Sequence, residues 1–107
     1  MIKYQRVIIV LEKLNQFLVN HHDQYMQPTI IEYLGRLKVL RDGENLPNEL
    51  LKDMQITLFG GMGSLNDLSI CRDNKHMVEN EKKANEELEE LRQKLKTVWR
   101  EEVGNLR

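Results

Sequence analysis

The first twenty residues carry apolar side chains at the three- and four-residue spacing of a single helix face. The β-branched residues Ile8 to Val10 favour a strand locally, but a consistent stripe over about 20 residues outweighs that preference. The pattern therefore predicts a helix over about residues 2–21. Its buried face would comprise Tyr4, Val7, Ile8, Leu11, Leu14, Phe17 and Leu18.

A second helix is predicted over about residues 29–42. Pro28 suits the first turn of a helix, or the turn before it, because it has no N–H to leave unpaired. Thr29 and Glu32 have the Thr-x-x-Glu spacing of a capping box. Gly43 is expected to end the helix, since glycine readily adopts the left-handed conformation found after helices. The apolar positions are Ile30, Leu34 and Leu37, with Ile31, Tyr33 and Leu40 at the edges.

A third helix is predicted over about residues 46–59. Asn45 and Pro47 are typical of helix starts, and Gly60-Gly61 ends the apolar pattern. Its stripe consists of Leu50, Leu51, Met54 and Leu58.

The helical period is absent between residues 60 and 74. Leu68 to Cys71 alternates apolar and polar residues, which indicates either a short strand or an extended segment. Arg72 to Asn74 reads as a turn, in which Asp73 or Asn74 could cap the following helix.

The last helix, predicted over about residues 75–102, has a narrow apolar stripe between charged positions. Such a seam packs against one neighbour: the first helix of the same chain, or a second copy of this helix in a homodimeric coiled coil. The stripe comprises Met77, Ala84, Leu88, Leu91, Leu95 and Val98.

These elements predict an all-α fold for residues 1–107, with about four helices in one domain. The helices would form a bundle or an orthogonal array around one glycine-rich insertion. A chain of 107 residues is the size of one compact domain.

The charge balance excludes a general nucleic-acid binder. The chain has 16 Lys and Arg against 17 Asp and Glu, whereas binding to phosphates needs a basic surplus. Cys71 is the only cysteine, which suits a reducing cytosol. The apolar run Val7 to Leu11 is too short for a signal peptide or a membrane span. We therefore expect a cytoplasmic protein that has no membrane contact.

The histidines and the cysteine do not form a recognisable catalytic or metal site. His21, His22 and Asp23 are consecutive, and consecutive side chains on a helix point about 100° apart. His76 has no second ligand at the spacing of a zinc site, and Cys71 has no base fixed beside it. We expect no enzyme activity, no metal and no cofactor.

The glycine-rich loop 59–68 is the most informative segment. Gly60, Gly61 and Gly63 allow conformations that a β-carbon forbids, and Ser64 can lock the turn by hydrogen bonding. Phosphate-binding loops follow a strand and open a helix, whereas these glycines follow a helix. A structural role is therefore favoured over nucleotide binding.

The start of the last helix is strongly acidic. A solvated face with internal ion pairs explains this pattern, and so does a docking surface for a basic partner. The acidic residues are Glu79, Glu81, Glu86, Glu87, Glu89 and Glu90.

The decapeptide Phe-Gly-Gly-Met-Gly-Ser-Leu-Asn-Asp-Leu at 59–68, with the helix Ala84 to Leu91 after it, resembles a family of small uncharacterised bacterial proteins. Its members share a Gly-Gly-Met-Gly-Ser-(Phe/Leu)-Asn-Asp signature, and several look like immunity proteins of contact-dependent or polymorphic toxin systems. The resemblance covers roughly residues 29–100, and the long charged final helix departs from it.

The resemblance implies a protein that binds a cognate toxin domain, in many cases a nuclease, and occludes its active site. The expected partner contacts are Asn66, Asp67, Glu79, Glu86, Glu87 and Glu90. Two alternatives remain: a homodimeric structural or regulatory protein, and an enzyme that binds a small molecule through the glycine-rich loop.

Overall fold

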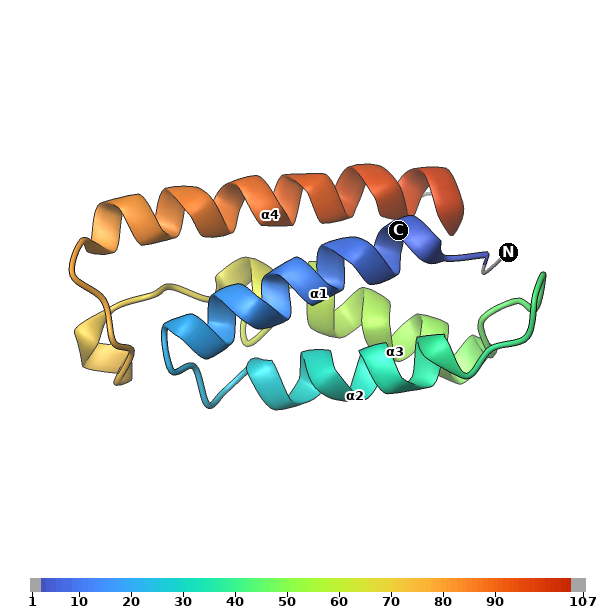
Figure 1. Ribbon diagram of the computed structural model, residues 1–107, viewed down its shortest axis with the longest axis horizontal. Coiled ribbons are helices and arrows are strands. Elements are labelled where there is room, and N and C mark those ends of the chain that lie inside the picture. Colours follow the sequence, from blue (N-terminus) through green and yellow to red (C-terminus); the bar gives the residue numbers. More distant parts are fainter. Residues whose placement is uncertain (1–2, 105–107) are drawn as a thin grey trace.

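The computed structural model describes residues 3–104 and confirms the all-α fold (Figure 1). The helices are α1 (Gln5–Asn20), α2 (Gln27–Lys38), α3 (Asn48–Phe59) and α4 (Glu81–Glu102). Two short 3₁₀ turns, η1 (Leu65–Asp67) and η2 (Arg72–Asn74), lie between α3 and α4. The predicted start of the first helix at residue 2 lies outside the described residues.

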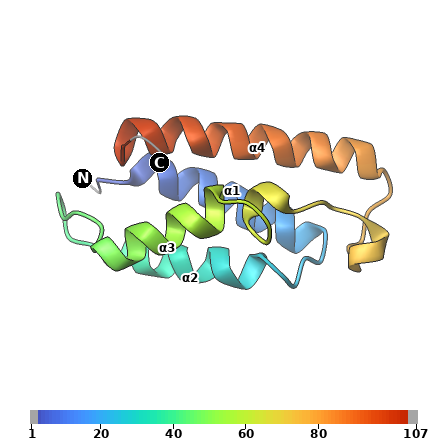
Figure 2. The same ribbon diagram turned by 180° about the vertical axis from the view of Figure 1, so that it is seen from behind.

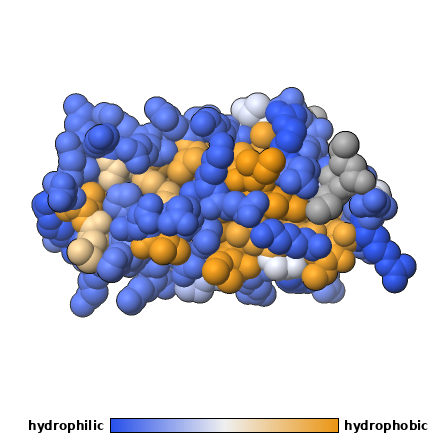
Figure 3. Space-filling view, in the orientation of Figure 1, coloured by the Kyte–Doolittle hydropathy of each residue, from blue (hydrophilic) through white to orange (hydrophobic). Residues whose placement is uncertain are grey.

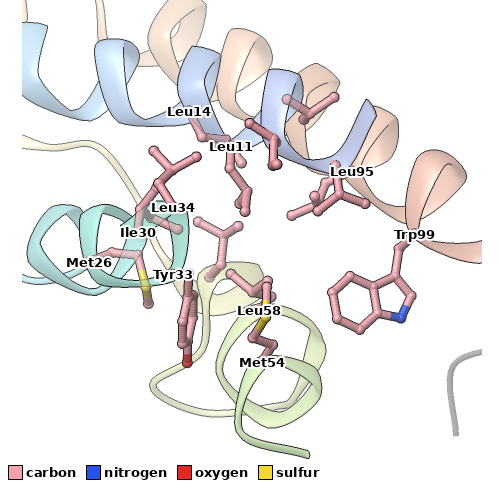
Figure 4. Close-up of a cluster of buried hydrophobic side chains, with 14 of the residues drawn as sticks. Leu11, Leu14, Met26, Ile30, Tyr33, Leu34, Met54, Leu58, Leu95 and Trp99 are labelled. Carbon is pink, nitrogen blue, oxygen red and sulfur yellow. The ribbon is translucent and has the colours of Figure 1, made fainter. Parts of the chain in front are cut away.

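Each helix runs antiparallel to the helix before it in the chain (Figure 1). Helix α1 lies between α4 on one side and α2 on the other, and α3 lies behind α1 and beside α2 (Figures 1 and 2). All four helices contribute to one apolar core, so the arrangement is a bundle. Figure 4 shows core side chains from each helix, among them Leu11, Leu14, Ile30, Leu34, Met54, Leu58, Leu95 and Trp99.

The seam of α4 packs against α1 of the same chain. Leu88 and Leu95 are fully buried there without any second copy of the protein. Trp99, which the apolar stripe did not include, is also fully buried and meets the ring of Phe59 edge to face. The intramolecular interpretation of the seam is therefore confirmed.

Helices α1 and α4 are also joined by hydrogen bonds where α1 begins and α4 ends. The carboxylate of Glu102 accepts hydrogen bonds from the backbone N–H groups of Arg6 and Val7, at 3.1 and 2.8 Å. Tyr4, which precedes α1, makes no side-chain cap of its own. Glu102 thus satisfies two of the free N–H donors in the first turn of α1, where the helix dipole also favours a negative charge.

The predicted boundaries of the second helix were wrong at both ends. Helix α2 starts at Gln27, includes Pro28 in its first turn and ends at Lys38. The capping box expected from Thr29 and Glu32 does not form. Asp23 supplies the cap instead, since its Oδ2 accepts from the N–H groups of Met26 and Gln27 at 2.7 and 2.8 Å.

The last helix begins six residues later than predicted. Its cap is Asn80, whose side chain accepts from the backbone N–H of Lys83, and not Asp73 or Asn74. Met77, assigned to the seam by sequence, therefore precedes the helix and is 62% exposed. The remaining stripe residues do face the core.

Residues 68–71 form an extended segment, and no strand is present in residues 3–104. The side chain of Asn85 takes the place of a neighbouring strand. Its Oδ1 accepts from the N–H of Ile70 at 2.8 Å, and its Nδ2 donates to the C=O of Ile70 at 2.9 Å. Ile70 is thereby held in the core while Ser69 faces solvent.

Polar residues cover most of the surface seen in Figure 3, and apolar colour gathers over α1 and the adjoining part of α2. Among the described residues, no helix is both long and apolar enough to cross a membrane.

Candidate functional site

Two irregular segments come together where α1 ends and α4 begins (Figures 1 and 2). They are residues 21–26, between α1 and α2, and residues 60–80, between α3 and α4. We call this region the loop end. The N–H of Met77 donates to the C=O of His21 at 2.9 Å, and the hydroxyl of Tyr25 donates to the C=O of Gly63 at 2.8 Å.

The glycine-rich loop is fixed by its own polar side chains. The hydroxyl of Ser64 donates to the C=O of Gly60 at 2.7 Å, and Asp67 Oδ2 accepts from the N–H of Gly63 at 3.1 Å. Asn66 Nδ2 donates to the C=O of Phe59 at 3.2 Å. Gly63 has a left-handed φ of 83°, which explains glycine at this position. The side chains of Asn66 and Asp67 thus help to shape the loop.

Arg92 on α4 holds the far side of the same loop. Its Nη1 donates to the C=O groups of Leu65, Asn66 and Leu68 at 3.0, 3.2 and 3.0 Å. Its Nη2 lies 2.9 Å from the carboxylate of Glu89. A hydrogen bond from Gln93, and then the charge and hydrogen bond of Arg92, lower the pKa of Glu89. The sequence did not identify this role for Arg92 because its partners are backbone atoms.

A cavity of about 580 Å³ opens between the two loop segments. We call it the loop pocket. Two of its lining residues, His22 and Lys75, adopt left-handed φ values of 57° and 65°, which side chains with a β-carbon rarely take. Such backbone strain is concentrated at functional sites in proteins. Asp67 and Ser64 also line this cavity.

A buried histidine–aspartate pair forms part of the wall of the loop pocket. His76 Nε2 lies 2.8 Å from Asp23 Oδ1, and both side chains are almost completely buried. The N–H of Cys71 donates to His76 Nδ1 at 3.2 Å, so the ring proton belongs on Nε2, which donates to Asp23. The pair joins the two segments of the loop end.

The sequence did not predict this pair. Asp23 was considered only together with the consecutive His21 and His22, and His76 had no partner at a recognisable spacing. The two residues are 53 positions apart, so no local pattern connects them.

The ring of His76 is not free to act as a general base in the loop pocket. Both ring nitrogens of His76 are occupied, and the hydroxyl of Ser64 is engaged with a backbone carbonyl. A general base needs a free nitrogen within reach of the proton that it removes. Within residues 3–104, no group of three or more His, Cys, Asp or Glu side chains could hold a metal ion.

The loop end exposes large apolar side chains on a fixed backbone. Tyr25, Met62 and Met77 are 62%, 98% and 62% exposed. Aromatic residues and methionine are enriched in the centres of protein interfaces. The hydroxyl of Tyr25 is already bonded to the loop, so its ring is held in place before any partner arrives.

The six predicted contact residues do not form a single cluster. Asp67 lines the loop pocket, whereas Asn66 lines a different cavity between α3 and α4. Glu79 and Glu87 line a second cavity of the loop end, which shares His76 with the loop pocket. Glu86 and Glu90 are exposed on the first half of α4. None of the four glutamates forms an ion pair within residues 3–104.

Between Ala84 and Arg100 the charges of α4 are segregated along the helix, although Lys82 and Lys83 precede this stretch and Glu101 and Glu102 follow it. From Ala84 to Leu91 every charged residue is a glutamate, and from Arg92 to Arg100 every charged residue is basic. The acidic half lies at the loop end (Figure 1).

Residues 38–79 match the model of a family described as a domain of unknown function, DUF6966. The match covers less than half of the chain and includes the glycine-rich loop and His76. No curated protein and no solved structure matches the chain.

Proposed function

We propose that this protein is an immunity protein that binds a cognate bacterial toxin domain and blocks its activity by stoichiometric occlusion. The family resemblance of the glycine-rich loop suggests the kind of partner, and the surface chemistry of the loop end suggests where it binds. A toxin of the nuclease class fits best, because its active-site cleft must be basic to accept a nucleic acid.

The observation that carries this proposal is the exposure of Tyr25, Met62 and Met77 on loops that are already locked. Ordering a flexible loop costs free energy on binding, and a preformed loop avoids that cost. The hydrogen bonds of Asp23, Asp67 and Arg92 supply this order. A partner can then bury the exposed apolar side chains without first ordering the loop backbone.

The acidic half of α4 supports a basic partner. Glu79 and Glu87 lie with Arg72 and Lys83 in the cavity next to Met77. Glu86 and Glu90 add exposed negative charge along the helix. Carboxylates around an apolar centre raise the association rate and select a partner of opposite charge.

The homodimer alternative has less support. A coiled coil through α4 would need Leu88 and Leu95 at its interface, but both are fully buried against α1. Exposing one buried leucine costs about 1.5–3 kcal/mol, so such a dimer would first have to open the bundle.

Co-expression with the product of the gene immediately upstream tests the proposal. We expect the two proteins to co-purify as a one-to-one complex, measured as mass in solution. The double variant Tyr25→Ser with Met77→Ser removes apolar contacts, together with the hydrogen bond from Tyr25 to Gly63, without changing charge, and it should reduce co-purification. A neighbour that does not bind, together with a stable dimer of this protein alone, would favour the homodimer instead.

A further inference from the structure

We infer a second binding site, for a small polyphosphate that carries an apolar ring, such as a nucleoside di- or triphosphate. It occupies a cavity of about 450 Å³ between α3 and the basic half of α4, which is within the size range of small-molecule pockets. This cavity borders the loop end at Gly60 and Asn66, but it does not include the exposed side chains Tyr25, Met62 and Met77 of the proposed toxin-binding surface. Its lining residues are Lys52, Gln55, Ile56, Phe59, Gly60, Asn66, Lys96 and Arg100.

Three cationic side chains meet at this cavity, and no carboxylate lines it. Within residues 3–104, no hydrogen bond or ion pair engages the side-chain nitrogens of Lys52, Lys96 or Arg100. Cations gathered in a concave site without counter-charges attract an anion of matching charge. Arginine and lysine together are the usual ligands of phosphate groups.

The carboxylates next to Lys52 and Arg100 in sequence are already bound elsewhere. Asp53, next to Lys52 in sequence, accepts from the hydroxyl of Tyr33 at 2.7 Å. Glu101, next to Arg100, pairs with Arg6 at 2.9 Å, and Glu102 accepts from the first turn of α1. The lining itself therefore carries three cationic side chains and no carboxylate, although Glu89 on α4 interacts electrostatically with Lys96 from outside the lining.

The cavity also has an apolar wall. Ile56 is 70% exposed at its rim, and the half-buried ring of Phe59 is supported from behind by Trp99, with ring centroids 5.1 Å apart. A purely inorganic anion would leave this surface unused, whereas a nucleobase could pack on it. The side-chain amide of Gln55 and the Oδ1 of Asn66, which makes no hydrogen bond within the described residues, can bond polar groups of such a ring.

The size and charge of the protein favour a small ligand over a nucleic acid strand. The formal net charge is −1, so the basic residues of this cavity are not part of a general basic surface. A strand would need cations along an extended track, with several phosphates contacted. A di- or triphosphate instead places its charges within one cavity.

The test is calorimetric titration of the purified full chain with ATP, GDP, AMP and adenosine. We expect saturable one-to-one binding of ATP and GDP tighter than about 1 mM, weaker binding of AMP and none of adenosine. Fluorescence provides a second readout, because Trp99 is the only tryptophan and packs on Phe59. Its emission should change with the same saturation curve.

The deciding variant is Lys96→Gln with Arg100→Gln, and the matched control is Arg36→Gln with Lys82→Gln, which removes the same charge at exposed sites away from the cavity. We expect the first variant to bind ATP at least about tenfold more weakly and the control to bind as the unmodified protein does. Absence of saturable ATP and GDP binding, or equal weakening in both variants, would overturn the proposal. Binding of a polyglutamate peptide in place of the nucleotides would overturn it as well, and would assign the cavity to an acidic protein segment.

Discussion

His76 Nε2 donates a hydrogen bond to Asp23 Oδ1 across 2.8 Å, and this buried contact joins two loops that are 53 residues apart. The other oxygen of Asp23 caps α2, and the other nitrogen of His76 accepts from the N–H of Cys71. One carboxylate therefore orders the turn between α1 and α2 and the segment before α4. The shape of the loop pocket depends on it.

Asp23→Asn should destabilise the protein by about 1–3 kcal/mol, because one buried donor is left unpaired. The single amide oxygen can accept from α2 or from His76, but not from both. The other tautomer of His76 does not restore the lost hydrogen bond without a new cost, because its Nδ1–H would then face the N–H of Cys71. Urea unfolding measures the loss, with exposed Gln24→Ala as the neighbouring control. A loss below about 0.5 kcal/mol would contradict the role of the pair.

Arg92→Met should loosen the glycine-rich loop while leaving the apolar stem of the side chain in place. Three carbonyl groups lose their charged donor, and we expect a loss of about 1–3 kcal/mol. Hydrogen exchange of the backbone amides in residues 63–70 should accelerate. Lys94→Met, at an exposed position of the same helix, is the control and should change stability by no more than about 0.5 kcal/mol. Unchanged exchange in Arg92→Met would show that the loop is held by its own side chains alone.

Tyr33 should make stability depend on pH in the alkaline range. Burial first, and then Asp53, raise the pKa of its phenol to about 12, against about 10 in an unfolded chain. A pKa raised by folding contributes stability that is fully present below pH 10 and is lost as the pH rises towards 12. The free energy of unfolding of Tyr33→Phe should therefore fall less steeply over this range than that of the unmodified protein.

The control for Tyr33 is Tyr25→Phe, since Tyr25 is exposed at the loop end. Phenolate absorbance should keep its transition near pH 12 in Tyr25→Phe and lose it in Tyr33→Phe. A transition that survives in Tyr33→Phe would assign it to another tyrosine.

The acidic half of α4 should contribute to partner binding through its charge. Glu86→Lys with Glu87→Lys should weaken the complex with the toxin domain at low salt and flatten its salt dependence, because the steering charge is reversed. Glu32→Lys with Glu49→Lys changes the net charge equally at exposed sites on α2 and α3 and should bind as before. Affinity measured by calorimetry at two salt concentrations separates these outcomes. Equal affinities of the two double variants for the toxin domain would show that this face of α4 is not part of the interface.

The periodic parts of the sequence predicted the four helices well. Leu11, Leu14, Leu88 and Leu95 recur at helical spacing over long stretches, and all four are fully buried. A helix face is a local property, so a single sequence reveals it. Trp99 escaped notice because it lies beside the narrow stripe, and its burial depends on Phe59 of α3.

The helix ends and the candidate site depended on contacts that the sequence does not encode locally. The distant pairing of Asp23 with His76 both caps α2 and shapes the loop pocket. The start of α4 at Glu81 left Met77 exposed instead of in the seam. Asn66 and Asp67 lie in η1, and their hydrogen bonds to Phe59 and Gly63 could not be read from composition.

The most direct test of the proposed function is the growth of cells that express the product of the gene immediately upstream, with and without this protein. We expect that the product of the upstream gene stops growth when it is expressed alone, and that co-expression of this protein restores growth. We also expect that the double variant Tyr25→Ser with Met77→Ser restores growth less well than the unmodified protein at equal abundance. A neighbour that is harmless by itself, or one that remains toxic when this protein is abundant, would contradict the assignment as an immunity protein.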